Sequence, residues 1–178
     1  MPRYVAFLRG INVGGHRVQM SRLREAFAEM GLGPAETFIA SGNVIFDSSS
    51  RTPAALETRI ESHLAASLGY AVPTLLRTPA ELDAVLAAPP FTPDELASAH
   101  AVHVLFLRDP IAPHEEPGLL ALDTPVDRLR PRCRELYWWC GGKLSESQIP
   151  PAAFGRALGP RVTTMRNTTM LKKLVAKL

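Results

Sequence analysis

Three arginines alternate along a short segment in the C-terminal third of this 178-residue chain: Arg128, Arg130 and Arg132. In an extended strand this period of two places their side chains on one face, about 7 Å apart. Guanidinium groups at that spacing can contact successive phosphates of a nucleic acid. The aromatic segment 137–139 of the next predicted strand could stack bases. Charged side chains are also the ordinary protection of an exposed sheet edge, so that alternative stays open.

A glycine-rich loop near the N-terminus is the second candidate, and its chemistry would be anion binding. Residues 9–15 hold three glycines between a predicted strand and a predicted helix, with Arg9 and Arg17 on either side. The backbone N–H groups of such a loop can surround an anion. The glycine spacing fits neither the dinucleotide-binding fingerprint nor the phosphate loop of nucleotide hydrolases. The alternative is a tight turn that needs glycine dihedral angles.

The tripeptide Ser41-Gly42-Asn43 places a hydroxyl and an amide at the tip of a predicted hairpin. A nucleophilic serine needs a nearby base, and the sequence places no histidine or acid to serve Ser41. An enzyme that handles phosphoesters or acyl groups with Ser41 or Asn43 is therefore an alternative function. Whether the chain is an enzyme stays open.

Metal and cofactor chemistry has little support in the sequence. His100 and His103 lie three residues apart on a predicted strand, hence on opposite faces. Cys133 and Cys140 are the only cysteines, too few for a structural zinc site without histidines. So few cysteines suit a reducing cytosol, and no apolar run approaches the length of a membrane span. We therefore expect no metal, no cofactor, no membrane association and a cytoplasmic location.

The elements that position these residues follow one pattern that occurs twice. Apolar residues at steps of three or four predict helices, and short apolar runs predict strands. The first half predicts a strand at 4–8, a helix that Ser21 caps and Gly31 ends, a hairpin of strands at 37–40 and 44–46, a helix at 53–69 and a strand at 72–77. This βαββαβ order is typical of the ferredoxin-like fold.

The second half repeats the order after a connector. Thr78-Pro79 and Thr92-Pro93 predict two short helices in the connector, which is also acidic. Beyond it we expect a strand at 102–107, a helix at 114–122, a hairpin of strands at 126–130 and 135–140, a helix at 151–158, a strand at 161–165 and a final helix capped by Asn167. The predicted fold class is α+β: two tandem ferredoxin-like units with antiparallel sheets (1–78 and 101–178), joined by a short helical connector (79–100).

Charge is distributed unevenly along the chain. The overall net charge is +3, but residues 79–124 carry −7 and residues 125–178 carry +8. Such an asymmetry concerns partners or self-association rather than fold. A nucleic acid or a nucleotide is the expected partner, and a homo-oligomer is compatible with the same pattern.

Two long motifs resemble a bacterial family known as domain of unknown function 1697. Its members open with Leu-Arg-Gly-Ile-Asn-Val-Gly-Gly, present here as 8–15, and continue with Phe-Ile-x-Ser-Gly-Asn-Val-Ile-Phe, present as 38–46. Residues 165–169 are similar to a third segment of the family but lack its tryptophan. The resemblance covers nearly the whole chain. It implies a fold built from ferredoxin-like halves and no established activity.

The resemblance also groups polar residues that lie in its motifs at strand ends or turns: Arg9, Asn12, Ser41, Asn43, Arg166 and Asn167. If the two halves pack sheet to sheet, these side chains would converge into one basic, amide-rich cleft. Two arginines without a carboxylate suit an anionic ligand, with nucleic acid or a nucleotide ahead of a metabolite. A protein-interaction or structural module without a small ligand is the remaining alternative.

Overall fold

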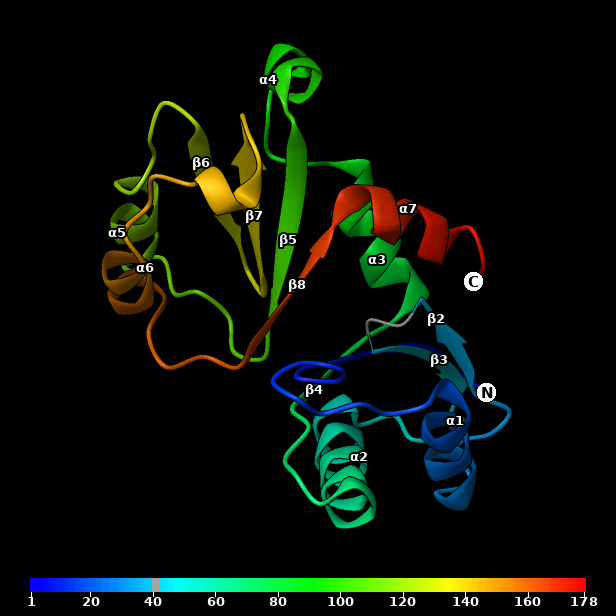
Figure 1. The fold of residues 1–178 in the computed structure, drawn as a ribbon. Coiled ribbons are helices and arrows are strands. Elements are labelled where there is room, and N and C mark those ends of the chain that lie inside the picture. The colour runs from blue at the N-terminus through cyan, green and yellow to red at the C-terminus, as the bar shows by residue number, and fades with distance from the viewer. Residues whose placement is uncertain (40–41) are drawn as a thin grey trace. The chain divides into compact units, whose positions relative to one another are not determined.

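The computed structural model describes residues 1–39 and 42–178, and Figure 1 shows its element order. The chain is an α+β protein with two four-stranded antiparallel sheets, which confirms the predicted class at that level. It divides into two compact units: residues 1–83 with 177–178, and residues 84–176. Each unit is described by itself.

The first unit has the strand order β2-β3-β1-β4, and all of its strand pairs are antiparallel. Its elements are β1 (Arg3–Leu8), α1 (Met20–Glu29), β2 (Glu36–Phe38), β3 (Asn43–Asp47), α2 (Pro53–Leu68) and β4 (Thr74–Arg77). The first and third strands are therefore central. Both faces of β1 are buried from Tyr4 to Leu8, in keeping with its unbroken apolar sequence.

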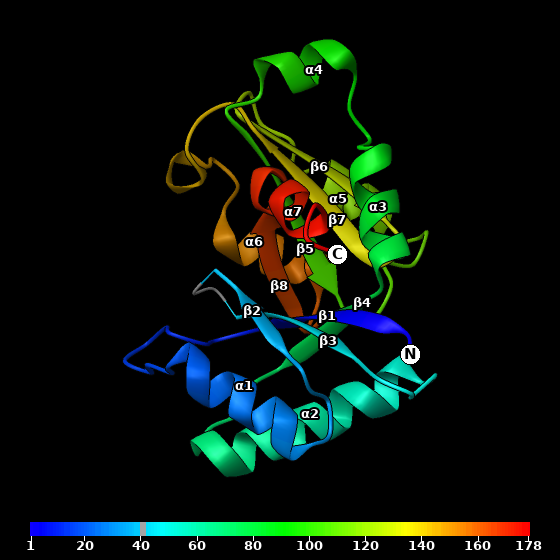
Figure 2. The ribbon, with the colours of Figure 1, turned by 90° about the vertical axis from the view of Figure 1, so that its right-hand side faces the viewer.

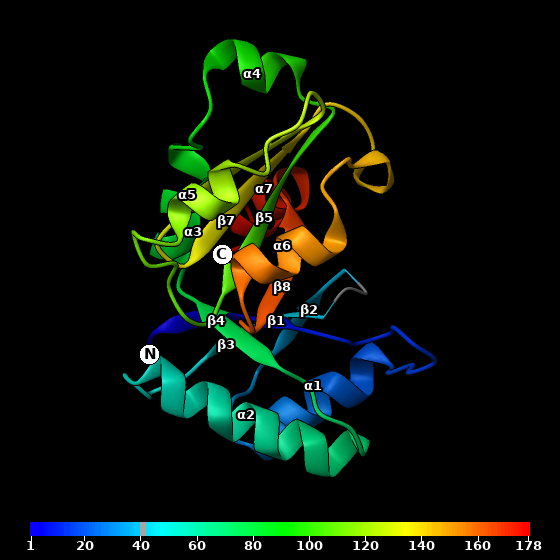
Figure 3. The same ribbon diagram turned by 90° about the vertical axis from the view of Figure 1, so that its left-hand side faces the viewer.

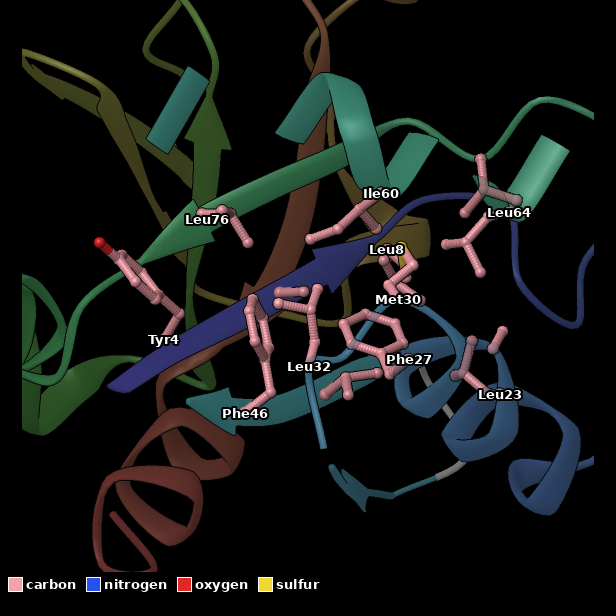
Figure 4. Close-up of a cluster of buried hydrophobic side chains, with 14 of the residues drawn as sticks. Tyr4, Leu8, Leu23, Phe27, Met30, Leu32, Phe46, Ile60, Leu64 and Leu76 are labelled. Atoms are coloured by element: carbon pink, nitrogen blue, oxygen red, sulfur yellow. The ribbon is translucent and has the colours of Figure 1, made fainter. Parts of the chain in front are cut away.

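The helices of this unit cover one face of its sheet (Figure 2). Every second residue of β1 points to them: Tyr4, Ala6 and Leu8 belong to the same buried cluster as Phe27 of α1 and Ile60 of α2. Figure 4 shows how these side chains interlock. The rings of Phe27 and Phe46 meet edge to face, with their centroids 5.2 Å apart. The apolar residues at every second position of the strands and at every third or fourth position of the helices thus pack into one core.

The second unit repeats the sheet order as β6-β7-β5-β8. Its strands are β5 (Ala101–Leu107), β6 (Asp127–Arg132), β7 (Glu135–Cys140) and β8 (Thr163–Asn167). Its helices are α4 (Pro93–Ser98), α5 (Glu116–Leu120), the 3-10 helix η1 (Leu144–Glu146), α6 (Pro151–Leu158) and α7 (Thr168–Val175), while α3 (Pro79–Ala87) spans the boundary between the units. The β-α-β-β-α-β order was predicted for both halves and is present in both.

Helices α5 and α6 lie on one face of the second sheet, and α7 lies on the other (Figures 1 and 3). Leu105, Leu136 and Trp138 pack toward α5 and α6 in one buried cluster. Trp138 also donates its indole N–H to the buried carboxylate of Asp127 at 2.9 Å. A second oxygen of Asp127 accepts the Gln148 N–H at 2.8 Å, so the acid is buried with its partners supplied.

Some predicted boundaries differ from the structure. Strand β2 ends at Phe38, because Ile39 has a φ of +56° that no strand can continue. Ser21 does not cap α1: the helix begins at Met20 with Gln19 in the N-cap position. Strand β8 runs two residues beyond the predicted end and includes Arg166. Thr92 does cap α4, with Glu95 completing a capping box.

Carboxylates satisfy the outward backbone donors of two edge strands. On β4, the N–H groups of Thr74 and Leu76 donate to Glu61 and Glu57 of α2, both at 2.8 Å. On β6, the Leu129 N–H donates to Asp123, also at 2.8 Å. An edge strand whose donors are occupied cannot pair with another chain through them.

We predict that Glu57→Leu lowers the free energy of unfolding by about 1–3 kcal/mol, because the buried Leu76 N–H loses its acceptor. Glu57→Gln keeps an oxygen at that position and should cost less. Urea denaturation monitored by circular dichroism measures both, with Glu25→Gln on the exposed face of α1 as the control. Equal stability of Glu57→Leu and the control would contradict this role for the carboxylate.

Candidate functional site

The predicted site residues of the first unit take up local structural contacts. Asn43 is fully buried, and its amide donates to the Phe38 carbonyl at 3.0 Å, which ties the hairpin together. Asn12 has a φ of +59°, and its Oδ1 accepts the Val18 N–H at 2.7 Å. Arg9 is exposed directly after β1. Ser41 lies outside the described residues.

The two sequence motifs meet where β1 ends. The Leu8 N–H donates to the Gly42 carbonyl at 2.8 Å. Gly42 has a φ of +74°, and a Cβ atom there would lie 3.0 Å from the Leu8 carbonyl oxygen and 3.3 Å from the Cβ of Ile11. Only glycine meets both demands, so the motif residues Leu8, Ile11 and Gly42 serve the fold at this point.

The loop after this contact forms one wall of a pocket of about 450 Å³. The Asn12–Val18 bond and a 3.2 Å bond from the His16 N–H to the Val13 carbonyl shape the loop. The pocket, called the loop pocket below, is lined by Gly15, His16, Arg17, Val18, Gln19, Arg22, Ser67, Leu68 and Tyr70. None of Arg9, Asn12, Asn43, Arg166 and Asn167, the predicted ligand-binding residues that the structure describes, lines it. The loop predicted at residues 9–15 is present, but only its last residue, Gly15, lines the pocket.

The loop pocket has an excess of basic and hydrogen-bonding groups. The His16 ring stacks on the Tyr70 ring with centroids 3.8 Å apart. The Tyr70 hydroxyl is buried without a hydrogen-bond partner among the described residues, and burial raises its pKa. Arg22 is neutralised by Glu29 at 2.7 Å, whereas Arg17 makes no ion pair within the described part of the chain. Such a lining can accept an anion.

Sequence reasoning missed His16, Gln19, Arg22 and Tyr70 as lining residues. His16 directly follows the double glycine, which could have marked it. Tyr70 follows the glycine that ends α2, and only the packing of α1 beside α2 brings it to the loop. No spacing along the chain connects those two positions.

The remaining predicted ligand residues belong to the second unit. Asn167 caps α7, accepting the Met170 N–H at 2.7 Å. Arg166 is half-buried and donates to the Thr164 hydroxyl and the Met165 carbonyl at 2.7 and 2.8 Å. Burial lowers the pKa of Arg166 to about 10. Convergence of these two residues with those of the first unit stays a prediction.

The three alternating arginines, called the arginine row below, lie on edge strand β6 as predicted. Arg128 pairs with Glu95 at 3.4 Å and sits over the Trp139 ring, 4.6 Å from its centroid. Arg130 pairs with Asp123 at 2.7 Å and lies 5.9 Å from the centroid of Phe91. Arg132 donates to the Ala88 carbonyl at 2.8 Å. Each guanidinium thus has a partner within its own unit.

The arginine row helps to hold residues 84–98, called the connector segment below, on the sheet. Two β7 side chains act with it: Tyr137 donates its hydroxyl to the Val85 carbonyl at 3.0 Å, and Trp139 donates its indole N–H to the Glu95 carbonyl at 2.5 Å. This intramolecular role was not predicted. Phosphate contact and edge protection by the row both stay predictions.

Cys133 is exposed in the β6–β7 turn and Cys140 is buried in β7, where burial raises the pKa of its thiol to about 11. No three His, Cys, Asp or Glu side chains of residues 1–39 and 42–178 group as a metal site would. Over the same residues, no helix is both long enough and apolar enough to cross a membrane.

Residues 1–137 match the model of a family described as protein of unknown function (DUF1697). The chain belongs to the DUF1697 family. The match includes both long motifs, which confirms the resemblance on which the sequence interpretation drew. Residues 165–169 lie beyond it.

An experimental structure has the same fold as this DUF1697 chain. It is that of the conserved bacterial protein SP0830 from Streptococcus pneumoniae, which is 24% identical, with a TM-score of 0.74 over 98% of this chain and 97% of that one. At this identity the likeness concerns the fold alone. No curated protein matches the chain.

We predict that acid weakens the attachment of the connector segment through Glu95. The hydrogen bond from the Thr92 N–H, the largest cause, and the charge of Arg128 hold the pKa of Glu95 below its usual value, although burial opposes them. A depressed carboxyl pKa stabilises above the unfolded-state value of about 4.3, and this stabilisation is lost as pH falls through the folded-state pKa.

The measurement is the protection factor of the Leu96 amide, which donates to the Thr92 carbonyl, by hydrogen exchange across that pH range. Protection should fall with acid in the parent and in Asp94→Asn, an exposed neighbour that serves as control. It should be nearly independent of pH in Glu95→Gln. A Glu95→Gln profile as steep as the parent's would assign the effect to another group.

Proposed function

We propose that this chain binds a small phosphate-bearing anion, such as a nucleotide, in the loop pocket. The observation that carries the proposal is the buried hydroxyl of Tyr70, which has no partner among the described residues, on a side chain that lines the pocket together with Arg17 and His16. A buried hydroxyl left unpaired costs about 1–3 kcal/mol. An oxygen atom of a bound ligand removes that cost.

The size and charge of the loop pocket support the same ligand class. Its volume of about 450 Å³ is in the ordinary range for small-molecule sites. No carboxylate of the described residues pairs with Arg17, so its guanidinium suits bidentate contact with phosphate oxygens. Gly15 adds a backbone at a φ of +90° that brings no Cβ into the space.

The alternatives have less support. An enzyme that uses Asn43 would need its amide, but Asn43 is fully buried and donates to Phe38. Nucleic-acid binding by the arginine row would compete with the contacts of all three guanidiniums to the connector segment and Asp123. We also infer that the chain is cytoplasmic. In addition, we infer that its two units are tandem ferredoxin-like units, since both share the same element order and strand order.

Isothermal titration calorimetry with adenosine 5′-monophosphate, inorganic phosphate and adenosine tests the proposal. We expect adenosine 5′-monophosphate and inorganic phosphate to bind saturably. Arg17→Gln should weaken the Kd of both about tenfold or more, because a charge-assisted hydrogen bond contributes about 1.5–3 kcal/mol. Arg51→Gln, an exposed arginine of the same unit outside the pocket, is the matched control. Equal binding of adenosine, or equal losses in both variants, would refute phosphate recognition by the loop pocket.

Tyr70→Phe separates binding from folding because its two expected effects have opposite signs. Removal of the unpaired hydroxyl should raise the free energy of unfolding of the ligand-free protein by about 1 kcal/mol. The same change should weaken the binding of adenosine 5′-monophosphate. Thermal denaturation with and without the nucleotide measures both. A variant that binds as tightly as the parent would show that the hydroxyl does not contact the ligand.

A further inference from the structure

A second pocket lies within the unit of residues 84–176 and has a different character. Its volume is about 260 Å³, and three segments line it: the connector segment, the start of β5 and the first turns of α7. It is called the helix pocket below. We propose that the helix pocket binds a small carboxylate that carries a short apolar body.

The connector segment and β5 provide an apolar wall. Val85, Leu86 and Leu96 of the connector segment line the pocket, and so does Val102 of β5. Leu96 remains 38% exposed, although most leucines of the chain are buried. Covering such a side chain contributes about 25 cal/mol per Å² of apolar surface removed from water. The wall therefore favours a ligand with a hydrocarbon portion.

Helix α7 provides the polar wall. Thr168 and Thr169 bring hydroxyl groups, and Lys172, one turn further along, brings a positive charge. His100, the residue before β5, also lines the pocket. None of the described lining residues is acidic, and Lys172 makes no ion pair within the described part of the chain. A single ammonium group with hydroxyl donors matches a singly charged headgroup.

The apolar wall is held in place by the contacts described above. Arg132 and Tyr137 bind the carbonyls of Ala88 and Val85, and Trp139 binds that of Glu95 next to Leu96. The connector segment is therefore anchored at both of its ends, which reduces the ordering that a ligand must bring about. The volume of about 260 Å³ lies just below the range for drug-sized ligands, so the body must be short.

The experiment titrates the full-length protein with hexanoate, with hexanol and hexylamine as uncharged and cationic analogues of equal chain length. Amide resonances of Val102, Thr168 and Lys172 are followed in two-dimensional NMR spectra. We expect saturable shifts with hexanoate and a Kd at least about tenfold weaker for both analogues, which corresponds to about 1.4 kcal/mol. Shifts that do not saturate, or equal affinity for hexanol, would overturn the proposal.

Two variants and their controls locate the binding. Lys172→Met retains the aliphatic stem and should weaken hexanoate about tenfold or more, while Lys173→Met, on the same helix but outside the pocket, should not. Leu96→Asn, at a partly exposed position, should also weaken it. If Lys172→Met or Leu96→Asn binds like the parent, the helix pocket is not the site.

The two proposals can fail separately, because the helix pocket and the loop pocket share no residue. Arg17→Gln should leave the hexanoate titration unchanged, and Lys172→Met should leave the nucleotide titration unchanged. A loss of hexanoate binding in Arg17→Gln would place the carboxylate in the loop pocket and overturn the inference about α7.

Discussion

The approach of Gly42 to the end of β1 is the constraint on which the first unit depends. The Leu8–Gly42 hydrogen bond continues the pairing of the two central strands beyond Phe7 and Asn43. A Cβ at Gly42 would be crowded by Leu8 and Ile11, at 3.0 to 3.3 Å, and the φ of +74° strains any other residue there. Ile11 is itself buried, and its Cβ lies close to Gly42. From this anchored residue the chain enters the loop that Asn12 ties to Val18. The family motifs thus define the geometry from which the loop pocket follows.

In the second unit, the charged side chains of the arginine row make contacts within the unit itself. Its arginine row has the spacing of a phosphate-binding surface, yet each guanidinium lies against a carboxylate, a carbonyl or an aromatic ring of the same unit. These contacts neutralise part of the negative charge of residues 79–124 with part of the positive charge of residues 125–178. An arginine that is paired with a carboxylate of its own unit does not by itself indicate an external anionic partner. The same contacts hold the connector segment as one wall of the helix pocket.

Both pockets combine segments that are far apart in the sequence. The loop pocket joins residues 15–22 to the end of α2, and the helix pocket joins the connector segment to α7. Their polar groups differ. The first has Arg17, His16 and a buried hydroxyl, whereas the second has a single lysine beside an apolar wall. The two ligand classes that we propose therefore differ because the two pocket linings differ.

The sequence by itself determined the order of helices and strands and the helix caps at Thr92 and Asn167. These features follow from local rules: apolar periods of two or of three to four, and side chains that bond their own neighbours. Only the tertiary structure decided which polar residues share a pocket. Tyr70 meets His16, and Arg128 meets Glu95, because helices and strands separated by dozens of residues pack together. The distance between two such residues depends on the fold and cannot be read from their spacing along the chain. For this reason the predicted group of Arg9, Asn12 and Asn43 lies near the loop pocket but does not line it.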